Sequence, residues 1–448
     1  MELLTEWYSI AAFLVGMIIA LMLLGLPVAF AFLTTNLIGA AIFMGDGTLT
    51  GGLDAMPLLV SNAVDSVAIF ALIPVPLFII MGELFFHTGL AVRVFDALDR
   101  CFGRLPGRLS YITVAGGTIF ATLSGSTMAN TAMMGSLMVP EMTKRGYKRH
   151  MSMGPILGTG GLAMIIPPSA LAVLLASLAE IDIGGLLIAG VIPGLILAVL
   201  YSILIYLQVK IDPEAAPEYT VEPSTAKEII LSLIINVLPM GFIVFCVIGL
   251  ILLGVATPTE AAGFGAFGVV ILATLFRVLT WDVLVKSFAG SLRVTAMVLL
   301  IILASTTFSQ LLAFTGASAG LIDWATKVDL APLIVLLIMF GVLLILGMFM
   351  DQVSMMLLTV PIFFPLAETF QFDLIWFALI MLLALEISLT TPPFGLLLFV
   401  MVAVAPKGTT LWQVAKAAAP YICCALIVLV LLIIFPNLAL YLPSLMNN

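Results

Sequence analysis

Charged side chains are scarce in this 448-residue chain, at 9% of the sequence, whereas hydrophobic residues make up 63%. Soluble domains carry about 25% charged and about 45–50% apolar residues. The 16 Lys and Arg and 24 Asp and Glu residues are too few to cover the surface of a water-soluble protein of this length. The scarcity of charge therefore excludes a soluble globular protein and predicts a chain that uses the lipid bilayer as its solvent.

Cysteine and histidine are also few. The four cysteines lie in or beside apolar runs without metal-type spacing, so we expect them to be packing residues. Two histidines, His87 and His150, are too few for a histidine metal cluster. A Gly-x-x-x-x-Gly-Lys-Ser/Thr phosphate loop is missing as well, which excludes nucleotide hydrolysis by that route. We expect no resident cofactor, no enzyme activity and no nucleic-acid partner.

The apolar residues form ten segments long enough to cross a bilayer, which takes about 20 residues of helix. No basic leader precedes the first segment, so we expect it to remain as a span. The ten predicted spans are Tyr8–Leu24, Pro27–Met44, Phe70–His87, Met151–Ala179, Ile183–Val209, Ile229–Leu253, Pro258–Phe276, Val294–Leu312, Leu374–Val402 and Ala419–Leu442.

Two further apolar stretches are interrupted in the middle and are predicted to be re-entrant hairpins. The first, Ser110–Pro140, is broken at Ser124–Thr127 into halves of 13 residues, and basic residues flank it on both sides. Because basic residues stay in the cytoplasm, both ends of this stretch should lie on the same side. The second, Leu333–Pro365, is broken at Met350–Gln352 and has acidic flanks, so we expect it to enter from the opposite face. With this topology every basic residue except Lys327 falls on the cytoplasmic side.

Prolines recur at a nearly fixed offset of about half the chain, which indicates an internal duplication. Pro27 corresponds to Pro258, and Pro140 to Pro365. The Pro167-Pro168 pair corresponds in the same way to Pro392-Pro393. Since the two hairpins enter from opposite faces, the halves are inverted. Inverted repeats with interrupted spans are typical of secondary transporters, which bind their substrate near the bilayer midplane.

Four polar breaks lie at membrane depth: the two hairpin tips and the two spans broken by a Pro-Pro pair. Irregular backbone at that depth is tolerated where it lines a cavity or lies within protein, so each break is a candidate site. The predicted substrate-binding residues are Ser124, Gly125, Ser126, Thr127, Asn130, Pro168, Ser169, Thr391 and Pro392. The predicted sodium ligands are Ser126, Thr131, Gly158, Thr159, Asp351, Gln352, Ser354, Thr390 and Thr391.

Polar residues in membrane helices also have a purely structural explanation. Any single Ser, Thr or Gly is more often a packing residue than a ligand. Asp351 carries the sharpest signal, because a carboxylate at a hairpin tip is costly unless it is paired or coordinates an ion. For Glu83, Glu260 and Glu386 we prefer interhelical hydrogen bonding, with ion or proton transfer as the alternative.

Four segments resemble the large membrane subunit of the tripartite ATP-independent periplasmic (TRAP) transporters. They are Ser124–Tyr147, Ile166–Ser169, Ala256–Ala262 and Thr391–Gly395. The resemblance implies a multi-pass protein of the bacterial inner membrane that couples sodium to the uptake of an organic acid, such as a C4-dicarboxylate, a sialic acid or a keto acid. It also implies two partners, a small four-helix membrane subunit and a periplasmic binding protein. We expect the small subunit on a separate chain.

The same resemblance implies an all-α elevator transporter, in which a transport part moves against a scaffold. The scaffold would comprise residues 1–87, 181–207 and 229–315, and the transport part residues 88–180 and 316–405. Residues 208–228 would form a cytoplasmic linker and 406–448 a C-terminal span. A re-entrant-loop channel and a secondary anion transporter without a binding protein stay open as alternatives. An intramembrane aspartyl protease is disfavoured, since it needs two facing aspartates and only Asp351 is well placed.

Overall fold

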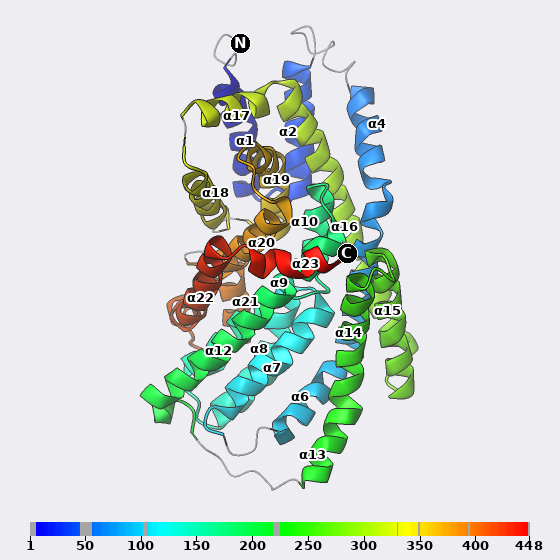
Figure 1. The fold of residues 1–448 in the computed structure, drawn as a ribbon, viewed down its shortest axis with the longest axis vertical. Helices are drawn as coiled ribbons and strands as arrows, with labels where there is room; N and C mark the ends of the chain where they lie inside the picture. The colour runs from blue at the N-terminus through cyan, green and yellow to red at the C-terminus, as the bar shows by residue number, and fades with distance from the viewer. Residues whose placement is uncertain are drawn as a thin grey trace.

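The computed structural model describes residues 6–44, 56–101, 105–217, 225–328, 330–347, 350–392 and 395–446. In these ranges all regular structure is helical, as the apolar pattern predicts (Figure 1). The first half holds α1 (Trp7–Leu23), α2 (Val28–Phe43), α4 (Met56–Val67), η1 (Phe70–Leu72), α5 (Pro74–His87), α6 (Leu90–Cys101), α7 (Arg108–Ser124), α8 (Thr127–Lys144), α9 (Arg149–Ile165), α10 (Ala170–Leu178), α11 (Ile183–Ala189) and α12 (Val191–Ile211).

The second half follows a short η2 turn (Pro213–Ala215). It holds α13 (Ala226–Ser232), η3 (Leu233–Val237), α14 (Leu238–Leu252), α15 (Pro258–Leu275), α16 (Trp281–Phe314), α17 (Ala317–Lys327), α18 (Pro332–Leu346), α19 (Gln352–Thr369), α20 (Leu374–Thr390), α21 (Leu396–Val404), α22 (Leu411–Ile434) and α23 (Asn437–Met446).

Six helices of the described chain are long and apolar enough to cross a bilayer, and two bent helix pairs raise the number to as many as eight. This is an all-helical membrane protein, with fewer full-length spans than the ten expected. The helices α1 and α2 have only 17 and 16 residues. Conversely, α19 has 18 residues and qualifies as a span by length and composition, although the sequence predicts it as one arm of a hairpin. It is 72% buried inside the protein, which fits a helix covered by neighbours.

Both Pro-Pro pairs interrupt their helices, as predicted. The helix α9 ends at Ile165 and α10 begins at Ala170, with a bend of 43° between them. In the second half α20 ends at Thr390 and α21 begins at Leu396, while Pro393 lies outside the described residues. Proline lacks the N–H that a continuous helix needs and disfavours helical backbone in the residue before it. The sequence is thus sufficient to place these two breaks.

The helices α7 and α8 form a hairpin in which the start of α7 lies next to the chain that follows the end of α8. Ser110, in the first turn of α7, donates a hydrogen bond to the carbonyl oxygen of Met151 at 2.8 Å. The Leu109 N–H donates to Tyr147 Oη at 3.4 Å. The turn contains Gly125 at φ +58°, a left-handed conformation that suits glycine. The arms have 17 and 18 residues, longer than the 13 predicted, because α7 already begins at Arg108 and α8 continues through Pro140 to Lys144.

The helix α18 packs against α19 and α20, and the α18–α19 pair corresponds to the predicted second hairpin, whose turn lies partly outside the described residues. Figure 1 shows this pair in the upper half of the molecule and the α7–α8 pair in the lower half. The basic connections lie together: Lys148 Nζ is 2.6 Å from the Asp212 carboxylate, and Arg149 is hydrogen-bonded to Gln413. Three connections that are far apart in sequence thus meet, as the sorting of basic residues requires.

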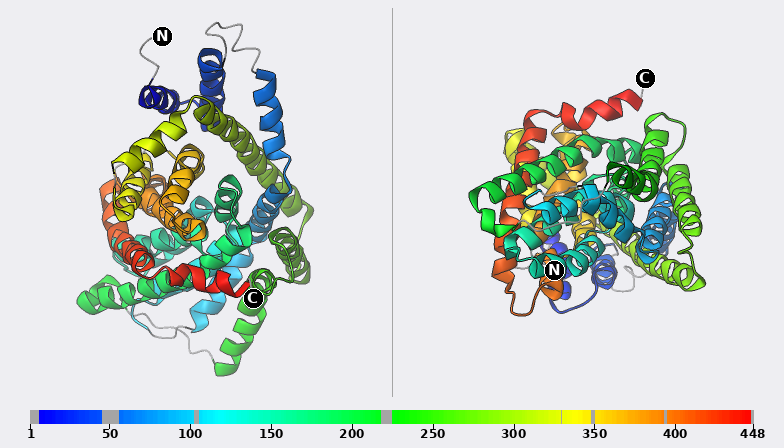
Figure 2. Two further views of the ribbon diagram at one scale, coloured as in Figure 1. Left: turned by 45° about the horizontal axis from the view of Figure 1, so that its top comes forward. Right: turned by 90° about the horizontal axis from the view of Figure 1, so that it is seen from below.

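The helices pack as two groups. One group is built on α5 and α16, which pack against each other and contact α15 and α2, respectively. The other is built on α9, which packs against α7, α8, α12, α20 and α22. Figure 2 shows α20 and α22 (orange to red) on one side of the molecule and α14 and α15 (green) on the other, as in Figure 1. The groups touch where α5 meets α7 and α10, and where α16 meets α19. The predicted division into scaffold and transport parts stays a prediction.

Candidate functional site

The two hairpin tips meet inside the protein. Gln352, the first residue of α19, donates a hydrogen bond from Nε2 to Thr127 Oγ1 of α8 at 3.1 Å. The same Nε2 atom is 3.2 Å from Met164 Sδ in α9. A Cβ atom at Gly125 would lie 3.4 Å from the backbone nitrogen of Ala170, so the first tip also lies against the start of α10. Residues from both halves of the chain therefore form one site.

Three helix N-termini converge at this point, and a side chain caps each of them. Ser126 accepts a hydrogen bond from the Ala129 N–H in α8, and Ser169 accepts one from the Ala172 N–H in α10. Asp351 caps α19 by accepting from the Val353 N–H at 3.1 Å. The first N–H groups of a helix have no partner within it and carry partial positive charge. Their convergence favours a bound anion.

A cavity of about 380 Å³ lies between the tips and the α5–α16 group. This volume is in the range that holds small organic ligands. Its described lining contains no Lys or Arg, whereas Glu83 and Asp351 are both present. The lining residues from the tips and α10 are Gly125, Ser126, Thr127, Met128, Ala129, Ala170, Leu171, Leu174, Asp351, Gln352 and Val353. Those from α5 and α16 are Val75, Ile79, Gly82, Glu83, Phe86, Val294, Met297 and Val298.

Glu83 lines the cavity, although it is not among the site residues predicted from the sequence. Its carboxylate lies 3.2 Å from His87 Nε2, one helical turn later in α5. Its carbonyl oxygen accepts a hydrogen bond from Ser287 Oγ in α16, at 3.2 Å. We predicted an interhelical hydrogen bond for the Glu83 side chain, but its carboxylate pairs within α5, and only its backbone carbonyl bonds to α16. The carboxylate lies at the cavity. To predict this position, one would need to know which face of α5 points toward the cavity. A helix that is apolar on all sides does not show this in its sequence.

The crossing of α8 and α9 contains oxygens without hydrogen-bond partners among the described residues. Asn130 donates from Nδ2 to the carbonyl oxygen of Thr159 at 3.0 Å. Its Oδ1 atom and Thr131 Oγ1 are buried and unpartnered. Buried polar atoms normally have partners, so such exceptions indicate a bound water or ion. Neutral oxygen atoms are ligands that hard cations accept.

Other predicted residues bond within their own segments. Thr159 donates to the carbonyl oxygen of Pro155 at 2.9 Å, while Thr390 and Thr391 both donate to that of Ile387, at 3.0 and 2.7 Å. Ser354 donates to the Asp351 carboxylate. These bonds satisfy each hydroxyl proton locally and leave oxygen lone pairs that can still accept.

The remaining predicted residues divide by location. Pro168 lies beside the first tip, with its carbonyl oxygen 4.0 Å from a Cβ built at Gly125. Gly158 lies instead against the rings of Tyr201 and Tyr421, and it lines a separate small cavity together with Thr390. Pro392 is half-buried, and the side chain of Ser124 lies outside the described residues.

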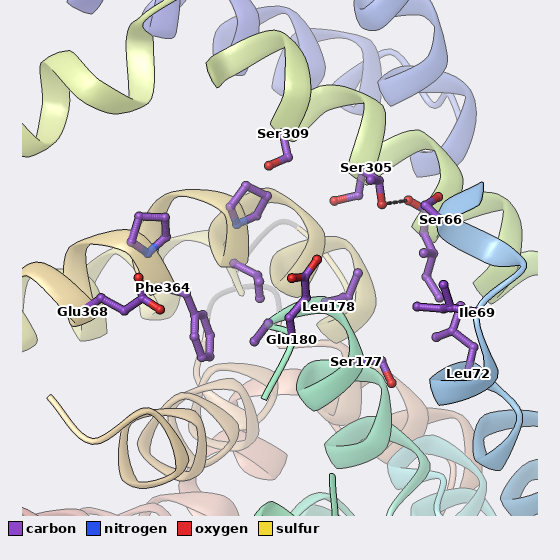
Figure 3. A pocket seen from close by; sticks show the side chains of 16 residues that line it. Ser66, Ile69, Leu72, Ser177, Leu178, Glu180, Ser305, Ser309, Phe364 and Glu368 are labelled. Atoms are coloured by element: carbon purple, nitrogen blue, oxygen red, sulfur yellow. Dashed lines mark hydrogen bonds between the residues drawn. The ribbon is translucent and has the colours of Figure 1, made fainter. Parts of the chain in front are cut away.

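A second large cavity, of about 340 Å³, was not anticipated from the sequence (Figure 3). It lies where the ends of α10 and α19 face α16 and the segment from α4 to η1. Glu180 and Glu368 contribute carboxylates to its lining, and Ser66, Ser305 and Ser309 contribute hydroxyls. One wall comes from α4, which lies outside every predicted span.

The sequence matches the family profile "Tripartite ATP-independent periplasmic transporter, DctM component" over residues 15–438. It is 32% identical over 381 residues to the C4-dicarboxylate TRAP transporter large permease protein DctM of Pseudomonas aeruginosa, covering 84% of this chain and 86% of that protein. It is 29% identical over 435 residues to the ectoine TRAP transporter large permease protein TeaC of Halomonas elongata, covering 96% and 98%.

A third relative is the sialic acid TRAP transporter permease protein SiaT of Haemophilus influenzae, with 28% identity over 381 residues, covering 84% of this chain and 60% of that protein. Among solved structures, the fold is similar to the crystal structure of the Alcanivorax borkumensis YdaH transporter. That comparison has a TM-score of 0.60 at 11% sequence identity and covers 88% of this chain and 89% of the other. The family match extends over nearly the whole chain, which therefore belongs to the DctM component family of TRAP transporters and is a transporter permease, not an enzyme.

Proposed function

We propose that this permease takes up a small organic acid together with sodium ions, and that the acid binds in the cavity between the hairpin tips. The observation that carries the proposal is the convergence of three capped helix N-termini on one cavity. A substrate carboxylate would meet backbone N–H groups and helix dipoles there, without a lysine or arginine. The solutes named for the relatives, a C4-dicarboxylate, ectoine and a sialic acid, all carry a carboxylate.

Sodium is the proposed coupling ion because the site needs positive charge that its side chains do not supply. The unpartnered oxygens of Asn130 and Thr131 offer ligands beside the first tip. Asp351 offers a carboxylate at the second. An ion bound near each tip would offset the negative charge of Glu83 and Asp351 and raise the affinity for an anion. Each ligand then shifts the protein toward the state that binds the other more tightly.

The proposed mechanism is of the elevator type. The cavity has one wall made by the tips and α10 and another made by α5 and α16, so movement of the first wall along the second would carry the solute across the bilayer. The tripartite family implies two partners, a small membrane subunit and a periplasmic binding protein that delivers the solute. We place the assembled transporter in the bacterial inner membrane.

Reconstitution into proteoliposomes with the small subunit and the binding protein tests this function. A panel of C4-dicarboxylates, keto acids, sialic acid and ectoine would be offered with an inward sodium gradient and with the gradient replaced by choline. We expect saturable accumulation of at least one acid that requires both the sodium gradient and the binding protein. Non-saturable flux that stops at equal concentrations would identify a channel. Uptake unchanged without the binding protein would identify a simple anion transporter.

A further inference from the structure

A buried carboxylate lies at the junction of α9, α12, α20 and α22. Glu386 of α20 is only 3% exposed. Its Oε1 atom accepts a long hydrogen bond from Tyr201 Oη of α12, at 3.4 Å. Its Oε2 atom has no partner among the described residues, and none of their ion pairs includes Glu386. A carboxylate in the interior of a membrane protein is costly unless it is paired or neutralised.

A second unpartnered oxygen belongs to the same junction. Tyr421 of α22 is 2% exposed, and its Oη atom has no hydrogen-bond partner among the described residues. The rings of Tyr421 and Tyr201 pack with their centroids 5.1 Å apart. Both tyrosines and Glu386 line a cavity of about 10 Å³. That volume is close to the minimum that holds one water molecule.

Two glycines of α9 make the space for this cluster. A Cβ atom at Gly161 would lie 2.1 Å from Glu386 Oε1, and one at Gly158 would lie 2.6 Å from the Tyr421 ring. Any larger residue at either position would occupy the room taken by the carboxylate or the ring. Small residues on α9 and large polar residues on three other helices thus build the cavity together.

We propose that Glu386, Tyr201 and Tyr421 bind one monovalent metal cation, at a site separate from the proposed ions at the hairpin tips. The two unpartnered atoms are oxygens with free lone pairs, and oxygen ligands suit hard cations such as sodium. The single negative charge of Glu386 matches the charge of one monovalent ion. The cavity of about 10 Å³ has room for one ion and no more. The ion would join α20 to α12 and α22, four residues before α20 breaks after Thr390. A proton on Glu386 would also cancel the charge, but it would bring no ligand for Tyr421 Oη.

Equilibrium binding of radioactive sodium to the purified protein in lipid nanodiscs, with choline as the balancing cation, tests the proposal. We expect Glu386→Gln to bind one sodium ion fewer per protein than the wild type. Tyr421→Phe keeps the ring packing, and we expect it to weaken the affinity of that ion at least tenfold. Glu260→Gln is the matched control, because Glu260 is an exposed capping residue of α15 at a position where glutamine also caps.

Sodium binding by Glu386→Gln with the wild-type number and affinity would overturn the proposal and leave the proposed tip ions untouched. Sodium binding by Tyr421→Phe indistinguishable from wild type would overturn it as well, and this variant decides the question if Glu386→Gln elutes as an aggregate. A wild type that binds no sodium at all would contradict both this site and the sodium coupling proposed above. Thr131→Val separates the two, since we expect it to remove the ion beside the first tip and to keep the Glu386 ion.

Discussion

Replacing Gln352 with methionine should weaken solute binding, because the Gln352 amide joins the two hairpin tips. Methionine keeps the length of the side chain but cannot donate to Thr127 Oγ1. Thr127 is 1% exposed, so water cannot replace the lost partner easily. Leaving a buried polar group unsatisfied costs about 1–3 kcal/mol. When the lost hydrogen bond destabilises the closed arrangement of the two tips by this amount, the apparent Kd for the solute rises roughly 5- to 150-fold.

A double-mutant cycle makes this prediction quantitative. Solute affinity would be measured in nanodiscs for the wild type, Gln352→Met, Thr127→Val and the double variant. Since both single changes remove the same hydrogen bond, the double variant should bind about as weakly as the weaker single one. Strictly additive losses would show that the two side chains do not act as a pair, and would refute the role given to the contact between the tips.

Three further changes probe the same region. Gly125→Ala should lower the Tm in a fluorescence melting assay, because alanine at φ +58° costs about 1–2 kcal/mol; an unchanged Tm would contradict the left-handed turn. Thr131→Val should weaken sodium activation of uptake with little loss of Tm, since the hydroxyl has no hydrogen-bond partner among the described residues; unaltered sodium activation would remove Thr131 from the ion site. Ser169→Ala should cost about 1 kcal/mol of stability through loss of the α10 cap, measured by urea unfolding; a neutral effect would argue against the capping bond.

The sequence predicts the interruptions of the helices well and the partners of their polar residues poorly. Pro167 and Pro392 mark breaks because proline acts on its own backbone, wherever the helix packs. Pro140 does not end α8, since helix-breaking residues in membrane helices can be accommodated by neighbouring groups. Local chemistry alone does not distinguish these two outcomes.

Hydroxyl residues are ambiguous for a different reason. Thr159, Thr390 and Thr391 look like ligands in the sequence, yet each donates to a carbonyl oxygen three or four residues earlier in its own helix. A helix thus supplies an acceptor for such residues before any ligand does. The contact between Gln352 and Thr127 could not be predicted, because it depends on how two segments from opposite halves of the chain are packed.

The most direct test of the central claim is protection of the tips by solute. In a variant without the four native cysteines, single cysteines would replace Met128 and Val353, which line the cavity on the two tips, and Ser136, an exposed residue of α8, as the control. We predict that the transported acid with sodium slows thiol labelling at Met128→Cys and Val353→Cys and leaves labelling at Ser136→Cys unchanged. Equal labelling rates with and without the acid at both tip positions would contradict binding between the hairpin tips.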